Sequence, residues 1–512
     1  MQLARVIETS AAVAATRSRT AKVAALADTL RASTQSGPVE VVADYLAGTL
    51  PQRRVGVSWR GLREMPGPAA GSTLTVGEVD TALTALQAVT GTGSAAVRGA
   101  AVQALFSRAT ATEQDWLRGL VTGELRQGAG DGVMLKAIAE AAQVPEAAVR
   151  RAVMLAGLAG PVAAAALAGG EEALAAITLE VGRPLRPMLA ASAPDVPAAL
   201  ADPGGDVAID SKLDGIRVQV HLDRAATDGR AVRLFTRTLE EVTDRLPEVV
   251  EVIAALPADR AVLDGEVIAQ RPDGRPQPFQ VTGARTASTA DPERLRTEVP
   301  LTTYLFDLLH LDGRDLVDEP AAERWAVLAA LAPDHLVPRI TTSDPALAQE
   351  FFAERVAVGH EGVVVKSLTA PYAAGRRGAG WVKVKPRHTL DLVVLAVEWG
   401  GGRRQGWLSN IHLGARDEGT GELVMLGKTF KGMTDATLAW QTERFLALET
   451  HRTEYVVHVR PEQVVEIAFD GVQRSRRYPG GVALRFARVL RYRDDKPADQ
   501  IDTLQSVRAL RS

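Results

Sequence analysis

The sequence predicts a multidomain chain with an all-α N-terminal domain, an α+β middle domain and a small β-barrel domain at the C-terminal end. Residues 1–185 repeat apolar side chains at helical spacing. Pro184 and Pro187 break that pattern, because a proline removes a backbone donor and does not fit inside a helix. Residues 186–388 mix strand and helix patterns without regular alternation, and residues 389–512 are mainly short strand patterns between turn clusters.

The N-terminal domain contains a clear helix start. Thr110 and Glu113 have the spacing of a capping box ahead of apolar positions that begin at Trp116. Gly128 is the expected end of this helix, because glycine suits the residue after a helix. The charge-free run Ala152–Gly170 is mostly alanine and glycine, which predicts buried or alanine-rich helix and not a membrane span.

The composition is that of a soluble globular protein. The 512 residues are 46% hydrophobic and 24% charged, and this length suits roughly two to four domains. The absence of cysteine excludes disulfides and cysteine-ligated zinc. The first residues lack the apolar core of a signal peptide, so the expected location is the cytoplasm. A net charge of -3 neither indicates nor excludes a nucleic-acid partner, because a local basic stripe is enough to bind phosphate.

Short strand patterns dominate the rest of the chain. In the middle domain the predicted strands are Ile216–Leu222, Val232–Thr236, Ala261–Ile268, Leu301–Asp307, Gly362–Lys366 and Trp381–Lys385, and the predicted helices are Leu239–Leu256 and Pro320–Leu331. In the last domain the predicted strands are Leu392–Glu398, Ser409–Ala415, Leu423–Thr429, Tyr455–Val459 and Val464–Phe469, with a helix at Asp435–Leu448. Strands of this number with a single helix predict a Greek-key barrel of the OB type.

One short stretch has the form of a reactive site. Lys212 follows the strand-like run Val207–Ile209 and precedes the turn signal Asp214-Gly215. A lysine at such a junction is held rigidly, and its amine becomes a nucleophile when desolvation or neighbouring cations help it to lose a proton. The alternative is a hairpin with a solvated lysine at its tip, and these residues alone leave both interpretations open.

Further stretches of the middle domain carry charged side chains that can act together with Lys212 in one site. Glu266 and Glu361 each bring a carboxylate to a strand edge, where it suits a hard cation. Lys383 and Lys385 alternate along a strand pattern and are expected on one face, where two ammonium groups repel unless an anion lies between them. An exposed amphipathic strand explains the two lysines alone. With both carboxylates and Lys212 present, a triphosphate with Mg²⁺ is the more economical explanation.

The last domain concentrates positive charge in two runs, Arg474–Arg477 and Arg485–Lys496. A solvated basic strand is the simplest explanation of either run. Phe486 and Tyr492 interrupt the second run, and these rings argue against a purely solvated strand.

The motifs follow one another in an informative order. They are Lys-x-Asp-Gly-x-Arg at 212–217, Thr236-Arg237, Asp264-Gly265-Glu266, the strand of Phe306, Glu361 to Lys366, Lys383-x-Lys385, and the terminal Arg/Asp/Lys run. This order resembles the covalent nucleotidyltransferases, and within them the ATP-dependent DNA ligases of bacterial and archaeal type. The resemblance covers about residues 1–500, including the helical domain and the connecting stretch Arg186–Ala190. Each motif alone is weak, and all of them in this order are specific.

The resemblance implies an α+β nucleotidyltransferase (adenylation) domain in the middle of the chain and a role for each motif. Lys212 attacks the α-phosphate of ATP and carries AMP as a phosphoramidate, while Phe306 stacks on adenine. Glu266 and Glu361 help to hold Mg²⁺, and the run Arg485–Lys496 closes over the triphosphate. The implied ribose and phosphate ligands are Arg217, Arg237 and Glu266, and the implied α-phosphate ligands are Arg377, Lys383 and Lys385. The full implied ATP-binding set also contains Asp210, Asp214, Arg488 and Lys496.

The implied substrate is a nick in double-stranded DNA, which the helical domain and the barrel grip mainly through phosphates. In the implied second step AMP passes to the 5′-phosphate of the nick. In the third step the 3′-hydroxyl attacks that phosphate and displaces AMP. We further expect a monomer in the cytoplasm, associated with the nucleoid, without a membrane partner and with replication and repair proteins as candidate partners. One departure stands out: many family members have Glu where this chain has Asp210, so the adenine contact of that side chain is in question.

Other classes share part of this pattern. An mRNA-capping guanylyltransferase uses the same lysine chemistry and barrel, but the long helical N-terminal domain argues against it. An RNA ligase is a close variant. NAD-dependent ligases are disfavoured because the zinc-binding cysteines that they usually carry are missing here. A non-catalytic DNA-binding scaffold is disfavoured because the lysines and carboxylates are intact.

Overall fold

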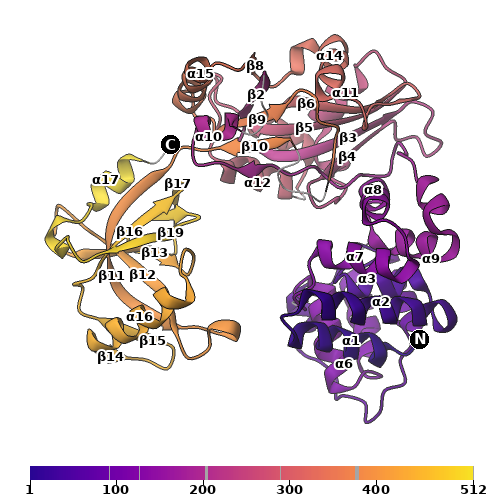
Figure 1. Cartoon of the computed structure of the whole chain (residues 1–512), viewed down its shortest axis with the longest axis horizontal. Coiled ribbons are helices and arrows are strands. Elements are labelled where there is room, and N and C mark those ends of the chain that lie inside the picture. The colour runs from indigo at the N-terminus through magenta and orange to yellow at the C-terminus, as the bar shows by residue number, and fades with distance from the viewer. Residues whose placement is uncertain (92, 126, 202–205, 289, 375–379, 511–512) are drawn as a thin grey trace. The chain divides into compact units, whose positions relative to one another are not determined.

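Helices fill the N-terminal part of the chain, as the apolar periodicity predicts (Figure 1). The structure is a computed structural model that describes residues 1–512 except for 92, 126, 202–205, 289, 375–379 and 511–512. The helices are α1 Leu3–Ala15, α2 Arg19–Ser36, α3 Val39–Leu46, α4 Val76–Ala88, α5 Ser94–Phe106, α6 Ala111–Thr122, α7 Asp131–Ala142, α8 Glu146–Ala156 and α9 Ala159–Ala175, with a 3-10 turn at Trp59–Leu62. Their apolar faces meet in one buried cluster that includes Leu26, Leu117 and Ile138.

Helix α6 confirms the predicted capping box and corrects the predicted helix end. The Thr110 hydroxyl accepts a hydrogen bond from the Glu113 backbone, and the Glu113 carboxylate accepts one from the Thr110 backbone. The end expected at Gly128 is wrong, because the helix stops at Thr122 and Gly123 takes φ 69°. Glycine adopts this left-handed conformation without a Cβ clash, so the first glycine after the apolar stripe ends the helix.

The charge-free run Ala152–Gly170 is mostly helical, as expected, and departs from helical geometry at Gly157, Leu158 and Gly170. It is divided between α8 and α9, and Gly157 caps the first of them with φ 79°. Within the described parts of the chain, no helix combines the length and the apolar character that a membrane crossing needs.

Two five-stranded sheets form the α+β part. One is antiparallel in the order β4-β3-β5-β6-β7, and the other has the order β1-β10-β9-β2-β8, with β1 parallel to β10. The strands are β1 Ala191–Ser192, β2 Val207–Lys212, β3 Ile216–Asp223, β4 Val232–Thr236, β5 Arg260–Ala269, β6 Leu301–Leu311, β7 Arg314–Asp315, β8 Arg339–Thr342, β9 Gly362–Ser367 and β10 Trp381–Val384. The helices are α10 Val196–Leu200, α11 Pro247–Ala254, α12 Phe279–Ala287, α13 Pro292–Glu298, α14 Ala321–Leu331 and α15 Pro345–Ala357.

The helix expected at Leu239–Leu256 is shorter in the structure, where α11 spans Pro247–Ala254 after a 3-10 turn at Thr243–Arg245. Leu246 has φ -128° and ψ 59°, outside the helical region. Proline disfavours helical geometry at the residue before it and favours the first helical position, so Pro247 sets the start. The second predicted helix agrees with α14 within one residue.

The last part of the chain is rich in strands, and all five predicted strands and the predicted helix are found. The elements are β11 His388–Trp399, β12 Leu408–Arg416, β13 Leu423–Thr429, α16 Asp435–Ala447, β14 Glu449–Arg452, β15 Val456–Val459, β16 Val464–Phe469, β17 Gly471–Arg474, β18 Val482–Arg485, β19 Arg488–Arg493 and α17 Leu504–Ala509. Strands β14, β17 and β18 have no counterpart among the predicted strands, whereas β19 lies in the basic run Arg485–Lys496, where a basic strand is one of the two interpretations. The main sheet runs β13-β12-β11-β15-β14, and β16 joins β11 to β19. Pairing among the described residues leaves this sheet open, so its closure into an OB barrel stays a prediction.

The chain separates into two compact units. The first contains Met1–Ala193, Pro197–Ala348 and Val364–Lys383, and the second contains Pro194–Val196, Gln349–Val363 and Val384–Ser512. The helical part and most of the α+β part therefore share one unit, and the strand-rich C-terminal part forms most of the other.

Candidate active site

Lys212 is the last residue of β2, and the chain around it is fixed on both sides. The Ser211 N–H donates to the Pro338 carbonyl at 2.8 Å, and Leu213 is buried against Ile268. Gly215 follows in the turn, where a Cβ atom would lie 2.3 Å from the Val267 carbonyl oxygen, so only glycine fits. The Lys212 side chain is half-buried. A lysine at the rigid end of a strand is what the sequence predicts.

Glu266 lies in the electrostatic field of Lys212. One oxygen of its carboxylate accepts a hydrogen bond from the Gly215 N–H at 3.2 Å, and the β3–β5 register places Glu266 opposite Arg217. Burial raises the pKa of Glu266 to about 7, although Lys212 and Arg217 act in the opposite direction. A nearby cation favours the charged form of a carboxylate, whereas burial disfavours it, and for Glu266 burial is the larger effect.

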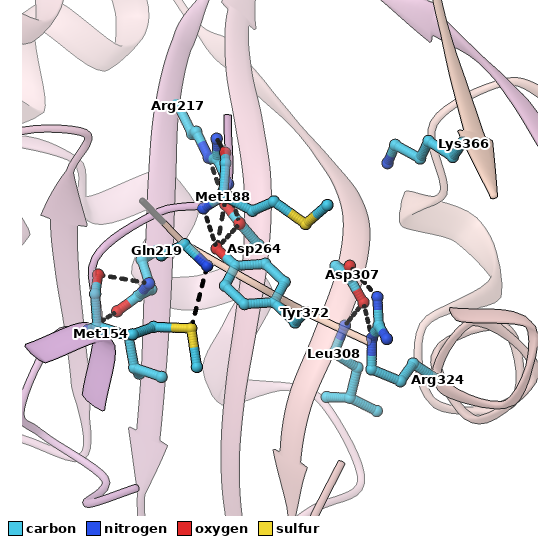
Figure 2. Close-up of polar contacts among 12 residues, drawn as sticks. Met154, Met188, Arg217, Gln219, Asp264, Asp307, Leu308, Arg324, Lys366 and Tyr372 are labelled. Atoms are coloured by element: carbon cyan, nitrogen blue, oxygen red, sulfur yellow. Dashed lines mark hydrogen bonds and ion pairs between the residues drawn. The ribbon is translucent and has the colours of Figure 1, made fainter. Parts of the chain in front are cut away.

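Arg217 is held almost entirely by the protein, as Figure 2 shows. Its Nε donates to Asp264 Oδ1 at 2.8 Å, and its Nη2 donates to Asp264 Oδ2. Its Nη1 donates to the Met188 carbonyl at 2.6 Å, and Nη2 also donates to the Tyr372 hydroxyl at 3.2 Å. A guanidinium group has five N–H donors, and these bonds use four of them. Arg217 therefore links β3 to Asp264, Met188 and Tyr372, and its predicted contact with ribose or phosphate stays a prediction.

The aromatic ring predicted to bind adenine has a second ring beside it. Phe306 on β6 is half-buried, and its ring meets that of Trp381 edge to face, with centroids 5.9 Å apart and planes at 79°. The Lys366 ammonium lies 4.6 Å from the Phe306 centroid and 4.3 Å from that of Trp381. The Arg217 guanidinium lies 5.4 Å and 5.5 Å from the same two centroids. The two rings therefore pack with two cations.

Asp210 is buried and neutralised by two cations. Arg339 lies opposite Asp210 in the β2–β8 register and donates to it through Nε and through Nη2, the latter at 2.9 Å. The Lys366 ammonium lies 2.6 Å from the second carboxylate oxygen. Burial alone raises the pKa of Asp210, but Lys366 and Arg339 outweigh it, and the pKa lies below its ordinary value. Arg339 also donates to the Phe306 carbonyl at 3.3 Å, so the ion cluster supports the strand that carries the ring.

In the second unit, Lys385 is paired with two carboxylates. Its ammonium forms an ion pair with Glu361 and another with Asp470 at 2.9 Å. These partners raise the pKa of Lys385 above its ordinary value despite the cost of burial, so the group stays charged. The predicted phosphate ligand Lys385 and the predicted metal ligand Glu361 thus lie together.

The terminal basic run is also paired within the second unit. Asp391 on β11 accepts hydrogen bonds from Lys496 at 2.8 Å and from Arg493 at 3.1 Å. Arg488 lies exposed at the start of β19. Two cations of the run thus converge on one carboxylate, which no motif of the sequence indicates.

The other predicted site residues occupy varied positions. Lys383 lies on β10 opposite Ser192 of β1, and Asp214 is half-buried in the turn after Lys212. Arg237 is exposed directly after β4. Arg377 lies outside the described residues. Within the described ranges, no group of three or more His, Cys, Asp or Glu side chains is arranged to hold a metal ion.

Four side chains of the site carry no role in the sequence analysis. Asp264 begins the Asp-Gly-Glu motif, which is its local signal, and Gly265 lies within β5 and not in a turn. Lys366 ends the motif Glu361 to Lys366, but its pairing with Asp210 results from the neighbouring positions of β9 and β2 in the sheet. Tyr372 and Arg339 have no local signal, because their partners are remote along the chain.

Comparisons with known proteins agree with the motif order. Residues 187–385 match the family model described as ATP dependent DNA ligase domain, residues 404–496 match the ATP dependent DNA ligase C terminal region, and residues 60–139 match the DNA ligase N terminus. The chain is 64% identical over 513 residues to a "Probable DNA ligase" of Nocardioides sp., which covers 99% of this chain and 98% of that protein. It is 62% identical over 518 residues to a "Probable DNA ligase" of Beutenbergia cavernae, with 100% and 99% covered.

A solved structure supports the fold. The structure "Pmar-Lig_PreS3" aligns with a TM-score of 0.61 at 18% identity and covers 95% of this chain and 99% of its own. At this identity the match shows a shared fold and nothing about residue roles. The two long relatives, which match nearly end to end, carry the assignment: the chain belongs to the ATP-dependent DNA ligases.

Proposed function

We propose that this chain seals nicks in duplex DNA with Lys212 as the nucleophile. The Lys212 amine attacks the α-phosphorus of ATP, so that a P–N bond forms while the P–O bond to pyrophosphate breaks. The 5′-phosphate of the nick then takes the AMP and releases the lysine. Attack by the 3′-hydroxyl forms the phosphodiester bond and releases AMP. The observation that carries this proposal is the fixed end of β2, which holds Lys212 in the field of Glu266.

The proposed reaction needs cations that meet the charge that develops on phosphorus. Fixed cations stabilise a transition state without reorganising, and this is usually a large catalytic effect. Lys383 and Lys385 are our candidates for the α-phosphate ligands, and Arg488 and Lys496 are candidates for the outgoing pyrophosphate. Arg237, which is exposed after β4, is a candidate ligand of the nucleotide or the nick.

We propose that adenine binds without a contact to the Asp210 carboxylate. Both of its oxygens are engaged by Arg339 or Lys366. We therefore assign adenine stacking to Phe306 and give Asp210 the role of anchoring Lys366 beneath that ring. A contact from the backbone of residue 210 to adenine is unaffected by the shorter side chain.

Mg²⁺ is the proposed metal, and Glu266 is the side chain that fits it. Its carboxylate lies in the field of Lys212, burial raises its pKa to about 7, and a hard cation prefers carboxylate oxygen. Glu361 is bonded to Lys385 and has to exchange that partner to bind a metal. When bound, the metal neutralises phosphate oxygens and orients the leaving pyrophosphate.

We propose three domains, with boundaries at 185 and 388, and an OB-type barrel for residues 389–512. The helical domain and the barrel bind the duplex mainly through phosphates, so affinity falls with salt and depends little on sequence. We propose a monomer that works in the cytoplasm at the nucleoid.

Labelling with [α-³²P]ATP and Mg²⁺ tests the proposal. The wild type is expected to gain one AMP, and both Lys212→Ala and Lys212→Arg are expected to gain none, because a guanidinium group stays protonated. The matched control is Lys136→Ala, which removes an exposed lysine of α7. A labelled Lys212→Ala protein contradicts the nucleophile. Label from GTP in preference to ATP favours a capping enzyme, and sealing of RNA nicks in preference to DNA nicks favours an RNA ligase.

A further inference from the structure

Tyr372 is buried, with 1% of its surface exposed, and it belongs to none of the motifs above. Its hydroxyl donates to Asp264 Oδ2 at 2.8 Å. It accepts a hydrogen bond from the Met188 N–H at 3.0 Å and from Arg217 Nη2 at 3.2 Å (Figure 2). A hydroxyl group has one donor and two acceptor positions, so these three bonds satisfy it completely.

The Tyr372 hydroxyl is the donor toward Asp264 and the acceptor toward Met188 and Arg217. Burial and the Asp264 carboxylate raise the pKa of Tyr372 well above its ordinary value, so the group remains protonated. Met188 is held through both of its backbone groups, because its carbonyl accepts from Arg217 and its N–H donates to Tyr372. The four residues form a closed network in which each one orients the others.

The ring of Tyr372 reaches the proposed adenine platform. It meets Trp381 edge to face, with centroids 6.1 Å apart and planes at 87°. Trp381 meets Phe306 in the same way at 5.9 Å. One side chain is thus joined through its hydroxyl to Arg217 and through its ring to the pair Trp381 and Phe306.

We infer that Tyr372 is a positioning residue for the adenylation step, because its hydroxyl fixes the Met188 backbone and Arg217, whose guanidinium lies over the ring of Phe306. The inference rests on the proposed function of that pocket. Tyr372 touches no reacting atom in this assignment and acts through Arg217, whose guanidinium lies over both aromatic rings. A small displacement of Arg217 should lower the adenylation rate, because the reacting groups need close alignment.

The variant Tyr372→Phe removes only the hydroxyl, and Tyr45→Phe is its matched control. Tyr45 is fully buried in the helical cluster and packs edge to face against Trp116, with centroids 5.9 Å apart. Its hydroxyl has no hydrogen-bond partner among the described residues. We expect Tyr372→Phe to lower the single-turnover adenylation rate at saturating ATP by roughly tenfold to a hundredfold. The ATP concentration for half-maximal rate should change less than about threefold, since the hydroxyl does not bind nucleotide. Tyr45→Phe should keep the wild-type values.

A double variant separates positioning from general loosening of the fold. If Tyr372 acts through Arg217, the variant Tyr372→Phe/Arg217→Lys adenylates at the rate of Arg217→Lys alone. If the two single effects multiply, Tyr372 acts independently of Arg217 and the inference is wrong. Rates are compared at a temperature at which circular dichroism shows every variant folded.

Hydrogen exchange tests the geometry without relying on activity. The peptide that contains Met188 should exchange faster in Tyr372→Phe than in Tyr45→Phe, because the Met188 N–H loses its acceptor. Equal exchange in the two variants overturns the inference, even if both proteins seal nicks. A wild-type protein that takes no AMP overturns the proposed function instead, and the exchange result still decides whether the hydroxyl holds this segment.

Discussion

The Asp391 carboxylate and the Lys496 ammonium lie 2.8 Å apart. Arg493 approaches the same carboxylate at 3.1 Å and also pairs with Asp495 at 2.8 Å, so one acid of β11 contacts two cations of the terminal basic run. Under the proposed function Lys496 is a candidate ligand of the phosphates of ATP. Asp391 would then compete with phosphate for Lys496, whose ion pair with Asp391 has to be exchanged when the nucleotide is bound.

Removing this internal anion should strengthen ATP binding. For Asp391→Asn we expect the ATP concentration at half-maximal adenylation to fall by about twofold to fivefold, since a partly exposed ion pair is worth up to about 1 kcal/mol. Single-turnover adenylation over a range of ATP concentrations measures it. The control Asp499→Asn removes the same charge from an exposed carboxylate. An unchanged or higher half-maximal concentration in Asp391→Asn contradicts the idea.

Glu266 should make the stability of the fold depend on pH. Its pKa is about 7 in the folded chain against an ordinary value of 4.5. The stabilisation by the neutral buried carboxyl is complete below the ordinary value and is lost as the pH rises through about 7, because a charge is then buried. Between pH 5 and pH 8 the wild type should lose about 2 kcal/mol relative to Glu266→Gln. Urea unfolding of both proteins at the two pH values measures this, and parallel pH profiles would show that Glu266 is not perturbed.

Replacing Arg324 should lower the free energy of unfolding more than most other single substitutions in the α+β part. Arg324 and Asp307 form an ion pair in which both side chains are 0% exposed (Figure 2). Arg324→Met leaves the Asp307 carboxylate buried without its main partner, so we expect about 3–5 kcal/mol of destabilisation in urea. The control Arg314→Met breaks the exposed pair with Glu323 and should cost less than about 1 kcal/mol. Equal costs for the two variants contradict this account.

Lys383 should affect chemistry more than folding. The β1–β10 pairing holds its backbone, since the Ala193 N–H donates to the Lys383 carbonyl at 3.1 Å whatever the side chain is. We expect Lys383→Ala to fold normally and to adenylate roughly a hundredfold more slowly, the usual cost of losing one fixed cation near a reacting phosphate. Single-turnover adenylation and thermal unfolding, with Lys136→Ala as control, decide the matter. A wild-type rate removes Lys383 from the site.

Element types were largely predictable from the sequence, because they depend on local patterns. The predicted bounds of β13 and β16 are those observed, since each is an alternating or apolar run between turn residues. The capping box at Thr110 is equally local. The misplaced end of α6 shows the limit of this approach, because two glycines close in sequence both suit a cap and the backbone used the nearer one, Gly123.

The sequence by itself determined the chemical inventory of this protein: a lysine at a strand end, its turn glycine, the carboxylates and basic runs, and the order that places the chain among DNA ligases. Only the tertiary structure decided which charges meet. Asp210 pairs with Arg339 from 129 positions away, and Tyr372 meets Arg217 from 155 positions away. Such partners are set by strand register and by burial, which arise from long-range packing and leave no periodic trace in the chain.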